Sequence, residues 1–194
     1  MRLLHDGIAA NAHALARYAA ICQEAGLVPI VEPEVLMDGD HTIERCEQVT
    51  EWTLNAVFEA LYMNRVSLEG SVLKPSMVIS GKKCPQQASV QEVAERTVRT
   101  LKRTVPAAVA GIAFLSGGQA DEVATAHLDA MNKLGNNPWP LSYSYGRALQ
   151  QPSLKAWRGQ SANVAAAQAA LAHRGRMNSL ASLGKYSAAL EAQK

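Results

Sequence analysis

The sequence has few cysteines, and they are not arranged as a metal site or a redox pair. Its 194 residues contain three, Cys22, Cys46 and Cys84, which lie far apart and form no C-x-x-C motif. An odd number of scattered cysteines is typical of free thiols in a reducing compartment, so we expect a cytoplasmic protein. The spacing also argues against a zinc site built from these residues.

The chain also lacks a strong net charge and a long hydrophobic run. Its formal charge is +2 at neutral pH, which is too small to indicate binding to nucleic acid or to a membrane surface. The longest uncharged run, residues 104–120, is interrupted by Pro106, Gly111 and a Gly-Gly pair. A membrane-spanning helix needs about 20 mostly apolar residues, so we expect a buried strand with its loops here and no membrane segment. Charged residues close to the N-terminus argue against a signal peptide.

Four short apolar segments are predicted to be strands. Each is too short to favour a helix and is interrupted or closed by proline or glycine, which is typical of strands buried on both faces. The segments are LVPIVEP (27–33), VSLEGSVLKPSMV (66–78), AGIAFLSGG (110–118) and WPLSYSYG (139–146).

Helical patterns lie before, between and after these strands. Apolar residues recur at helical spacing over 49–61 and 90–101, and Asp40 and Ser89 stand where helix N-caps are expected. Further helices are predicted near residues 8–25, 119–133 and 160–182. Alternating strands and helices predict right-handed crossovers and a parallel sheet, and no linker interrupts the pattern, so we expect one domain over residues 1–194.

The positions of the polar residues favour a barrel over a doubly wound sheet. A doubly wound sheet places a glycine-rich turn after its first strand, but VEPEVL follows here without G-x-G-x-x-G. Polar side chains instead follow every strand, as in (β/α)8 barrels, whose catalytic residues come from several strand ends. A complete barrel takes about 250 residues, so four strand–helix units predict an α/β fold of the parallel TIM-barrel type with half of the barrel present.

Lys74 ends the second predicted strand within the apolar segment VLKPSMV. An apolar environment or a nearby cation lowers the pKa of a lysine, whose neutral amine can then form a Schiff base with a ketone or aldehyde. We therefore expect Lys74 to be buried as a nucleophile. A lysine that reaches the rim of the sheet or pairs with a carboxylate is the alternative that spacing alone leaves open.

Glu32 and Glu34 follow the first predicted strand in the motif VEPE. Formation and dehydration of a carbinolamine need an acid–base group beside the lysine, and either carboxylate would serve. Alternation along a strand would place both on one face, although Pro33 disturbs that geometry. Pairing with a cation or capping of the next turn is the alternative for each.

Two motifs after the third and fourth strands indicate an anion site. In LSGGQ (115–119), Ser116, Gly117 and Gly118 can present backbone N–H groups at the start of a helix. In SYGR (144–147), Gly146 permits close approach and Arg147 supplies a guanidinium. Barrels often bind phosphate beside their last two strands, so together these motifs predict a phosphate site.

The motif DGDH (38–41) is the remaining candidate for a ligand site. Its two aspartates and its histidine stand at a loop-to-helix boundary, where aspartate also serves as a helix cap. We expect capping here and no metal site.

In combination, the quoted motifs resemble the class I fructose-1,6-bisphosphate aldolases. The resemblance covers about residues 11–186 and is carried by VPIVEPEVLMDGDH, LEGSVLKPSMV, KRTVPAAVAGIAFLSGGQ and SYSYGRALQ. It implies that Lys74 is the Schiff-base lysine, that Glu32 is its acid–base partner, and that Glu34 is the neighbour of that carboxylate. Ser76 replaces the asparagine that is usual in the family's lysine motif.

The resemblance also implies the rest of the chemistry. A substrate phosphate would be held by the residues Ser116, Gly117, Gly146 and Arg147. The reaction would be the reversible cleavage of fructose 1,6-bisphosphate, a sugar-phosphate substrate, into dihydroxyacetone phosphate and glyceraldehyde 3-phosphate. No metal or other cofactor is implied, because the protonated imine accepts the electrons. The complete family proteins are usually tetramers, so a homo-oligomer is expected.

The chain departs from the family in what it lacks. The first four strands of the family, which supply an aspartate, two lysines and an arginine to the site, are not matched, and MRLLHDG (1–7) and the C-terminal LEAQK do not resemble it. The resemblance thus implies only the last four β/α units, with open sheet edges at the first and fourth strands and weak or no activity alone. A catalytically silent half-barrel that binds sugar phosphates, or that needs a complementing N-terminal half, is one alternative; a transaldolase-like Schiff-base lyase is another.

Overall fold

The computed structural model describes residues 2–192 and shows helices alternating with short strands. The strands are β1 (Ile30–Val31), β2 (Val72–Leu73), β3 (Gly111–Phe114) and β4 (Leu141–Tyr143). The helices are α1 (Arg2–Glu24), α2 (Ile43–Met63), α3 (Val90–Thr104), α4 (Asp121–Leu134), α5 (Arg147–Trp157) and α6 (Val164–Ser182). Two short 3₁₀ helices, η1 (Ser161–Asn163) and η2 (Ala188–Ala192), complete the order.

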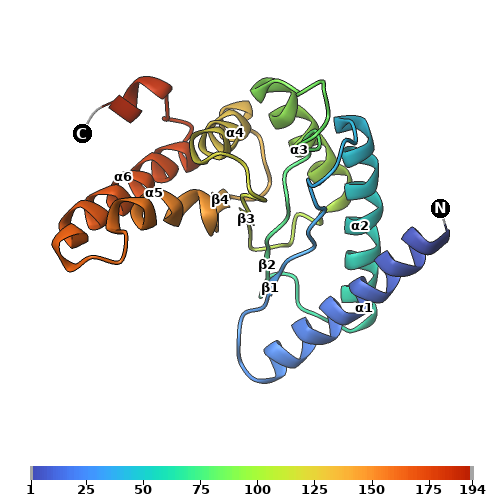
Figure 1. Cartoon of the computed structure of the whole chain (residues 1–194). Helices are drawn as coiled ribbons and strands as arrows, with labels where there is room; N and C mark the ends of the chain where they lie inside the picture. Colours follow the sequence, from blue (N-terminus) through green and yellow to red (C-terminus); the bar gives the residue numbers. More distant parts are fainter. Residues whose placement is uncertain (1, 193–194) are drawn as a thin grey trace.

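The strands form one parallel sheet in the order β1-β2-β3-β4 within the described part of the chain. Val72 is paired with Ile30 on one side and with Gly111 on the other, and Phe114 is paired with Tyr143. In Figure 1, α1 and α2 flank the β1 end of this sheet, whereas α5 and α6 flank its β4 end. The predicted α/β fold with parallel strands is confirmed.

The core lies between the sheet and the helices that follow its strands. On β3, Ile112 and Phe114 are buried, whereas Gly111 and Ala113 are partly exposed, so the covered face alternates with a more open one. α3 packs between α2 and α4 and turns Val98 and Leu101 toward this core. Because all three strand pairs are parallel, the carboxyl ends of the strands lie at one edge of the sheet.

The strands are shorter and less buried than predicted. In β1 the side chain of Val31 is buried, but Ile30 is 47% exposed, and its neighbours Leu27 and Val28 are exposed as well. Among the described residues β1 pairs only with β2, so no further strand covers its outer side. The prediction that these strands are buried on both faces is therefore wrong for β1, because an apolar composition records the tendency to be buried and not the presence of a neighbour.

One predicted helix cap is correct and the other is wrong. The side chain of Ser89 accepts a hydrogen bond from the backbone N–H of Glu92 and caps α3, as predicted. The cap of α2 is Thr42, whose hydroxyl accepts from the N–H of Arg45, and not Asp40. The chain stays extended through Thr42, so the first free N–H groups of the helix lie beyond the reach of Asp40.

Helix α5 was not predicted from the sequence. It begins directly after Gly146 and contains Pro152. Proline has no N–H and normally interrupts a helix, which is why the segment does not resemble one. α5 instead packs against α6, and Ser153 donates a hydrogen bond to the carbonyl of Ala167.

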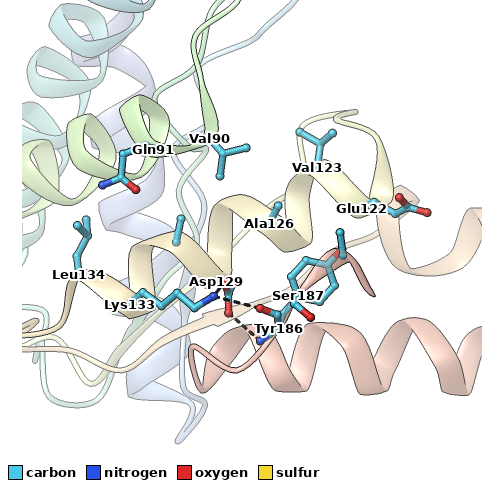
Figure 2. A pocket seen from close by; sticks show the side chains of 12 residues that line it. Val90, Gln91, Glu122, Val123, Ala126, Asp129, Lys133, Leu134, Tyr186 and Ser187 are labelled. Atoms are coloured by element: carbon cyan, nitrogen blue, oxygen red, sulfur yellow. Dashed lines mark hydrogen bonds and ion pairs between the residues drawn. The ribbon is translucent and has the colours of Figure 1, made fainter. Parts of the chain in front are cut away.

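The C-terminal segment is attached to α4 and α6 by polar contacts, some of which Figure 2 shows. The N–H of Tyr186 donates to Asp129 at 2.8 Å, and Lys133 donates to the carbonyl of Tyr186. Farther on, Glu191 accepts hydrogen bonds from the buried guanidinium of Arg174. A cavity of about 710 Å³ separates this segment from the start of α3, and none of the predicted site residues lines it.

Candidate active site

The parallel sheet places the ends of its strands side by side. Backbone hydrogen bonds continue past the strands: the N–H of Lys74 donates to Val31 at 2.7 Å, that of Leu115 to Pro75 at 3.1 Å, and that of Ser144 to Phe114 at 2.9 Å. The polar residues that follow each strand therefore start from neighbouring positions on one edge. This is the edge where α/β barrels carry their active sites.

Lys74 and Glu32 form an ion pair at this edge. The lysine Nζ lies 3.2 Å from a carboxylate oxygen of Glu32, and the two side chains are 20% and 44% exposed. Lys74 is thus less buried than we expected, because its side chain extends past the end of β2 toward the carboxylate of Glu32. The contact has the geometry of a nucleophile beside an acid–base group, and it equally has that of the simple ion pair which the sequence left open.

The backbone around Lys74 is packed on both sides. The next residues, Pro75, Ser76 and Met77, are buried. The hydroxyl of Ser76 accepts a hydrogen bond of 3.1 Å from the N–H of Val35, which ties the segment after β2 to the segment after β1. Ser76 thus fixes the relative position of the two segments that carry Lys74 and Glu32.

Glu34 is exposed and makes no ion pair with any residue of the described range 2–192. Together with Glu32 it lines a cavity of about 620 Å³ between α1, the end of β1 and α2. The structure therefore brings Glu32, but not Glu34, into direct contact with Lys74.

The LSGGQ segment forms a tight turn between β3 and α4. Gly117 and Gly118 have φ angles of +57° and +80°, which side chains with a Cβ rarely adopt, and the N–H of Gln119 donates to Ser116 at 3.0 Å. Ser116 itself is buried. Successive backbone N–H groups in a turn can form an anion-binding concavity.

A buried histidine makes a hydrogen bond to the side chain that follows this turn. The Nδ1 atom of His127 in α4 lies 2.7 Å from the side-chain oxygen of Gln119. Burial lowers the pKa of His127 to about 4, so the ring is neutral at physiological pH. The histidine thus supports the LSGGQ turn without adding a charge beside it.

The SYGR segment brings Arg147 to the same turn. Gly146 is the N-cap of α5, and Arg147 is the exposed first residue of that helix. A Cβ added to Gly118 would lie 3.0 Å from a guanidinium nitrogen of Arg147 and 2.9 Å from the Nζ of Lys82. Arg147 is therefore brought to the LSGGQ turn at Gly118, and Lys82 approaches the same position.

Sequence reasoning missed Lys82, whereas Gly118 was among the residues predicted to present backbone N–H groups. Lys82 lies in SGKK, eight residues after Lys74, where no strand-end pattern singles it out. Gly118 belongs to the predicted motif, but only the folded chain shows that both cations contact its position. A lysine after a glycine was the available signal, and it is too common to be specific.

The DGDH segment contributes an ion pair. Asp38 lies 3.0 Å from the Nζ of Lys82. No cluster of three or more potential metal ligands occurs between residues 2 and 192. Over the same range, no helix has both the length and the apolar character needed to cross a membrane.

Comparison with known proteins identifies the family. The family model described as fructose-bisphosphate aldolase class-I matches residues 4–194. This match is wider than residues 11–186, over which the motifs showed the resemblance, and it includes part of the N-terminal segment that does not resemble the family by eye.

Individual relatives agree with this match. The chain is 64% identical over 180 residues to a probable fructose-bisphosphate aldolase class 1 of Xanthomonas campestris pv. campestris, covering 92% of this chain and 54% of that protein. It is 59% identical over 179 residues to the fructose-bisphosphate aldolase of Dictyostelium discoideum, covering 92% and 50%.

A solved structure shows that the backbone agrees as well. The fructose-bisphosphate aldolase from Plasmodium falciparum, solved in complex with TRAP and a small molecule inhibitor, matches with a TM-score of 0.91 at 53% identity, over 93% of this chain and 52% of that one. The chain thus spans about half the length of the relatives it matches. It belongs to the class I fructose-bisphosphate aldolase family.

Proposed function

We propose that the chain carries the Schiff-base half of an aldolase site and takes part in the reversible cleavage of fructose 1,6-bisphosphate into dihydroxyacetone phosphate and glyceraldehyde 3-phosphate. The observation that carries the proposal is the contact of 3.2 Å between the Nζ of Lys74 and a carboxylate oxygen of Glu32. It supplies the nucleophile and the acid–base group that imine formation needs.

In this proposal the neutral amine of Lys74 attacks the keto carbon of the substrate. Glu32 gives a proton to the carbinolamine hydroxyl, which leaves as water, and the C=N bond forms. The protonated imine then accepts the electron pair of the breaking carbon–carbon bond as an enamine, while the carboxylate of Glu32 takes the proton of the substrate hydroxyl that becomes the aldehyde carbonyl. Glu34 is assigned a supporting role near Glu32, since both line the same cavity.

The phosphate of the substrate is assigned to the turn after β3 and to the start of α5. The residues proposed to hold it are Ser116, Gly117, Gly146 and Arg147. The support for this is that a guanidinium nitrogen of Arg147 lies 3.0 Å from the position of a Cβ on Gly118, in the turn that Gly117 and Gly118 form.

We further propose that the single domain of residues 1–194 is the last half of a (β/α)8 barrel that acts as a homo-oligomer in the cytoplasm. The unpaired outer sides of β1 and β4 in the described residues support association, because open sheet edges readily pair. Three free cysteines agree with a reducing compartment. A chain that sediments only as a monomer and also unfolds cooperatively in urea would count against the association.

A catalytically silent half-barrel is the second candidate, and coverage of only about half of each relative favours it. In that case the chain binds sugar phosphates but leaves the reaction to a complementing half.

Borohydride trapping tests the proposed chemistry. The chain is incubated with dihydroxyacetone phosphate, reduced, and mapped by mass spectrometry, with Lys74→Met as the negative control and Lys83→Ala as a matched neighbour. An adduct on Lys74 in the wild type and in the Lys83 variant supports the proposal. A folded chain that gives no adduct contradicts imine formation by this chain. A cleavage assay with and without an N-terminal half then tests the silent half-barrel.

A further inference from the structure

Lys82 and Arg147 come from different parts of the chain and meet at one point. The Nζ of Lys82 and the Nη1 of Arg147 lie within 3.0 Å of the position that a Cβ on Gly118 would occupy. Two like charges so placed repel each other unless an anion lies between them. Within residues 2–192, Arg147 has no carboxylate partner, and Lys82 has only Asp38. The cluster of Lys82, Arg147 and Asp38 therefore has one positive charge in excess.

The position of Lys82 is fixed by its backbone. The N–H of Lys82 donates to Met37 at 2.8 Å, and the flanking N–H groups of Gly81 and Lys83 donate to His41 and Gly39. A Cβ on Gly81 would lie 2.5 Å from the carbonyl oxygen of Gly39, so only glycine permits this approach. The lysine is consequently presented by two tightly packed segments.

There is also room for a ligand beside these groups. A cavity of about 570 Å³ is lined by Lys82, Gly118 and Gln119, together with residues of α3 and α4. The cavity lies next to the turn whose N–H groups we assign to the substrate phosphate. Of the two cations, Lys82 lines this cavity, whereas Arg147 approaches the turn at Gly118, which also lines it.

We propose that Lys82 is a further phosphate-binding residue, which acts with Arg147 on a phosphate monoester and is paired with Asp38 when the site is empty. This inference rests on the proposed function, because it concerns the same phosphate site. The Lys82–Asp38 pair is well exposed, at 37% and 69%, and such pairs are weak. A phosphate dianion carries more charge than a carboxylate and can replace Asp38 as the partner of Lys82.

Binding of inorganic phosphate tests this assignment without any catalytic step. The amide signals of Gly117 and Gly118 are followed by NMR while phosphate is added at constant ionic strength. We expect Lys82→Ala to weaken binding roughly tenfold, since one charge-assisted contact is lost. Lys83→Ala, which removes the neighbouring exposed lysine, should bind like the wild type, and Asp38→Asn should bind more tightly because the competing carboxylate is gone.

Trapping with two ketones then identifies the phosphate as that of the substrate. Lys82→Ala should raise the half-saturating concentration of dihydroxyacetone phosphate roughly tenfold and leave that of unphosphorylated dihydroxyacetone unchanged. Failure of the wild type to trap either ketone would contradict the proposed function while the phosphate titration still decides the role of Lys82. Equal phosphate binding by the Lys82 and Lys83 variants would overturn the inference.

Discussion

The Nζ of Lys74 lies 3.2 Å from a carboxylate oxygen of Glu32, although the two residues end different strands. The hydrogen bond from the N–H of Lys74 to the carbonyl of Val31 sets this register, since it aligns the residue after β2 with the residue before Glu32. The contact between Lys74 and Glu32 is thus a direct product of parallel pairing between β1 and β2.

Replacement of Glu32 by glutamine should slow imine formation on Lys74. The amide cannot move the protons that carbinolamine dehydration requires, and acid–base groups typically contribute at least a hundredfold in rate. We expect trapping with dihydroxyacetone phosphate to slow by roughly that factor, measured by quenching with borohydride over time. The free energy of unfolding should change by less than about 1 kcal/mol, because the ion pair is half exposed. An unchanged rate would remove Glu32 from the mechanism.

Glu34→Gln is the matched comparison for this variant. Glu34 is exposed and does not contact Lys74 directly. We therefore expect a smaller loss of trapping rate than for Glu32→Gln in the same assay. A loss as large as that of Glu32→Gln would show that Glu34 moves protons itself.

Gly118→Ala should weaken phosphate binding and destabilise the chain. The φ of +80° costs a residue with a Cβ about 1–2 kcal/mol, and the new methyl group would displace the charged ends of Lys82 and Arg147. Gly26→Ala is the control, since Gly26 has a φ of +72° but nothing within 4 Å of its added Cβ. Urea unfolding should show similar losses of stability for both variants, whereas only Gly118→Ala should reduce phosphate affinity. Equal phosphate affinity in the two variants would contradict the proposed site.

The free energy of unfolding should decrease as the pH falls, because the ring of His127 is buried. Burial lowers its pKa in the folded state from 6.5 to about 4, so the unfolded state binds a proton first as the pH drops. The stabilisation is complete above about pH 6.5 and is lost progressively toward pH 4, by about 2 kcal/mol at pH 5.

Urea unfolding between pH 7.5 and pH 5 measures this loss. His127→Gln, which retains a polar group opposite Gln119 but does not titrate, should flatten the profile over this range. A wild-type profile that is already flat would show that the ring takes up its proton over the same pH range in the folded and the unfolded state.

Glu191→Gln should release the C-terminal segment. Burial opposes ionisation of Glu191, but the hydrogen bonds donated by Arg174 and His173 outweigh it and lower the pKa of the carboxyl. The stabilisation is therefore present above about pH 4.5 and lost as the pH falls below that value. Removal of the charge leaves the buried guanidinium of Arg174 without a carboxylate, at a cost of about 3 kcal/mol.

Amide hydrogen exchange is the measurement for this variant. Tyr186, whose N–H is bonded to Asp129, should exchange faster in Glu191→Gln. Glu95→Gln, a change on the exposed surface of α3, should leave the exchange of Tyr186 unchanged. Normal protection of Tyr186 in Glu191→Gln would show that the other contacts suffice to hold the segment.

The order of the predicted strands and helices and the identity of the chemical groups follow from the amino-acid pattern alone. Short apolar segments ending in proline or glycine are incompatible with long helices, and the helical spacing between them requires crossovers, so a parallel sheet followed from pattern alone. The motifs around Lys74 and Arg147 were specific enough to indicate the family before any geometry was known. Local features of low specificity, such as the cap of α2 and the helix that contains Pro152, were missed or misplaced, because several neighbouring residues have similar local preferences.

Which charged groups meet depends on the tertiary structure. Lys74 contacts Glu32 and not Glu34, and Lys82 joins Arg147 at Gly118, because strand register and the pairing of two loops bring together residues that are distant in the chain. The exposure of β1 was likewise decided there, since burial depends on which elements are present to cover a strand. A sequence records what each residue prefers, whereas contact depends on long-range packing, which no local pattern contains.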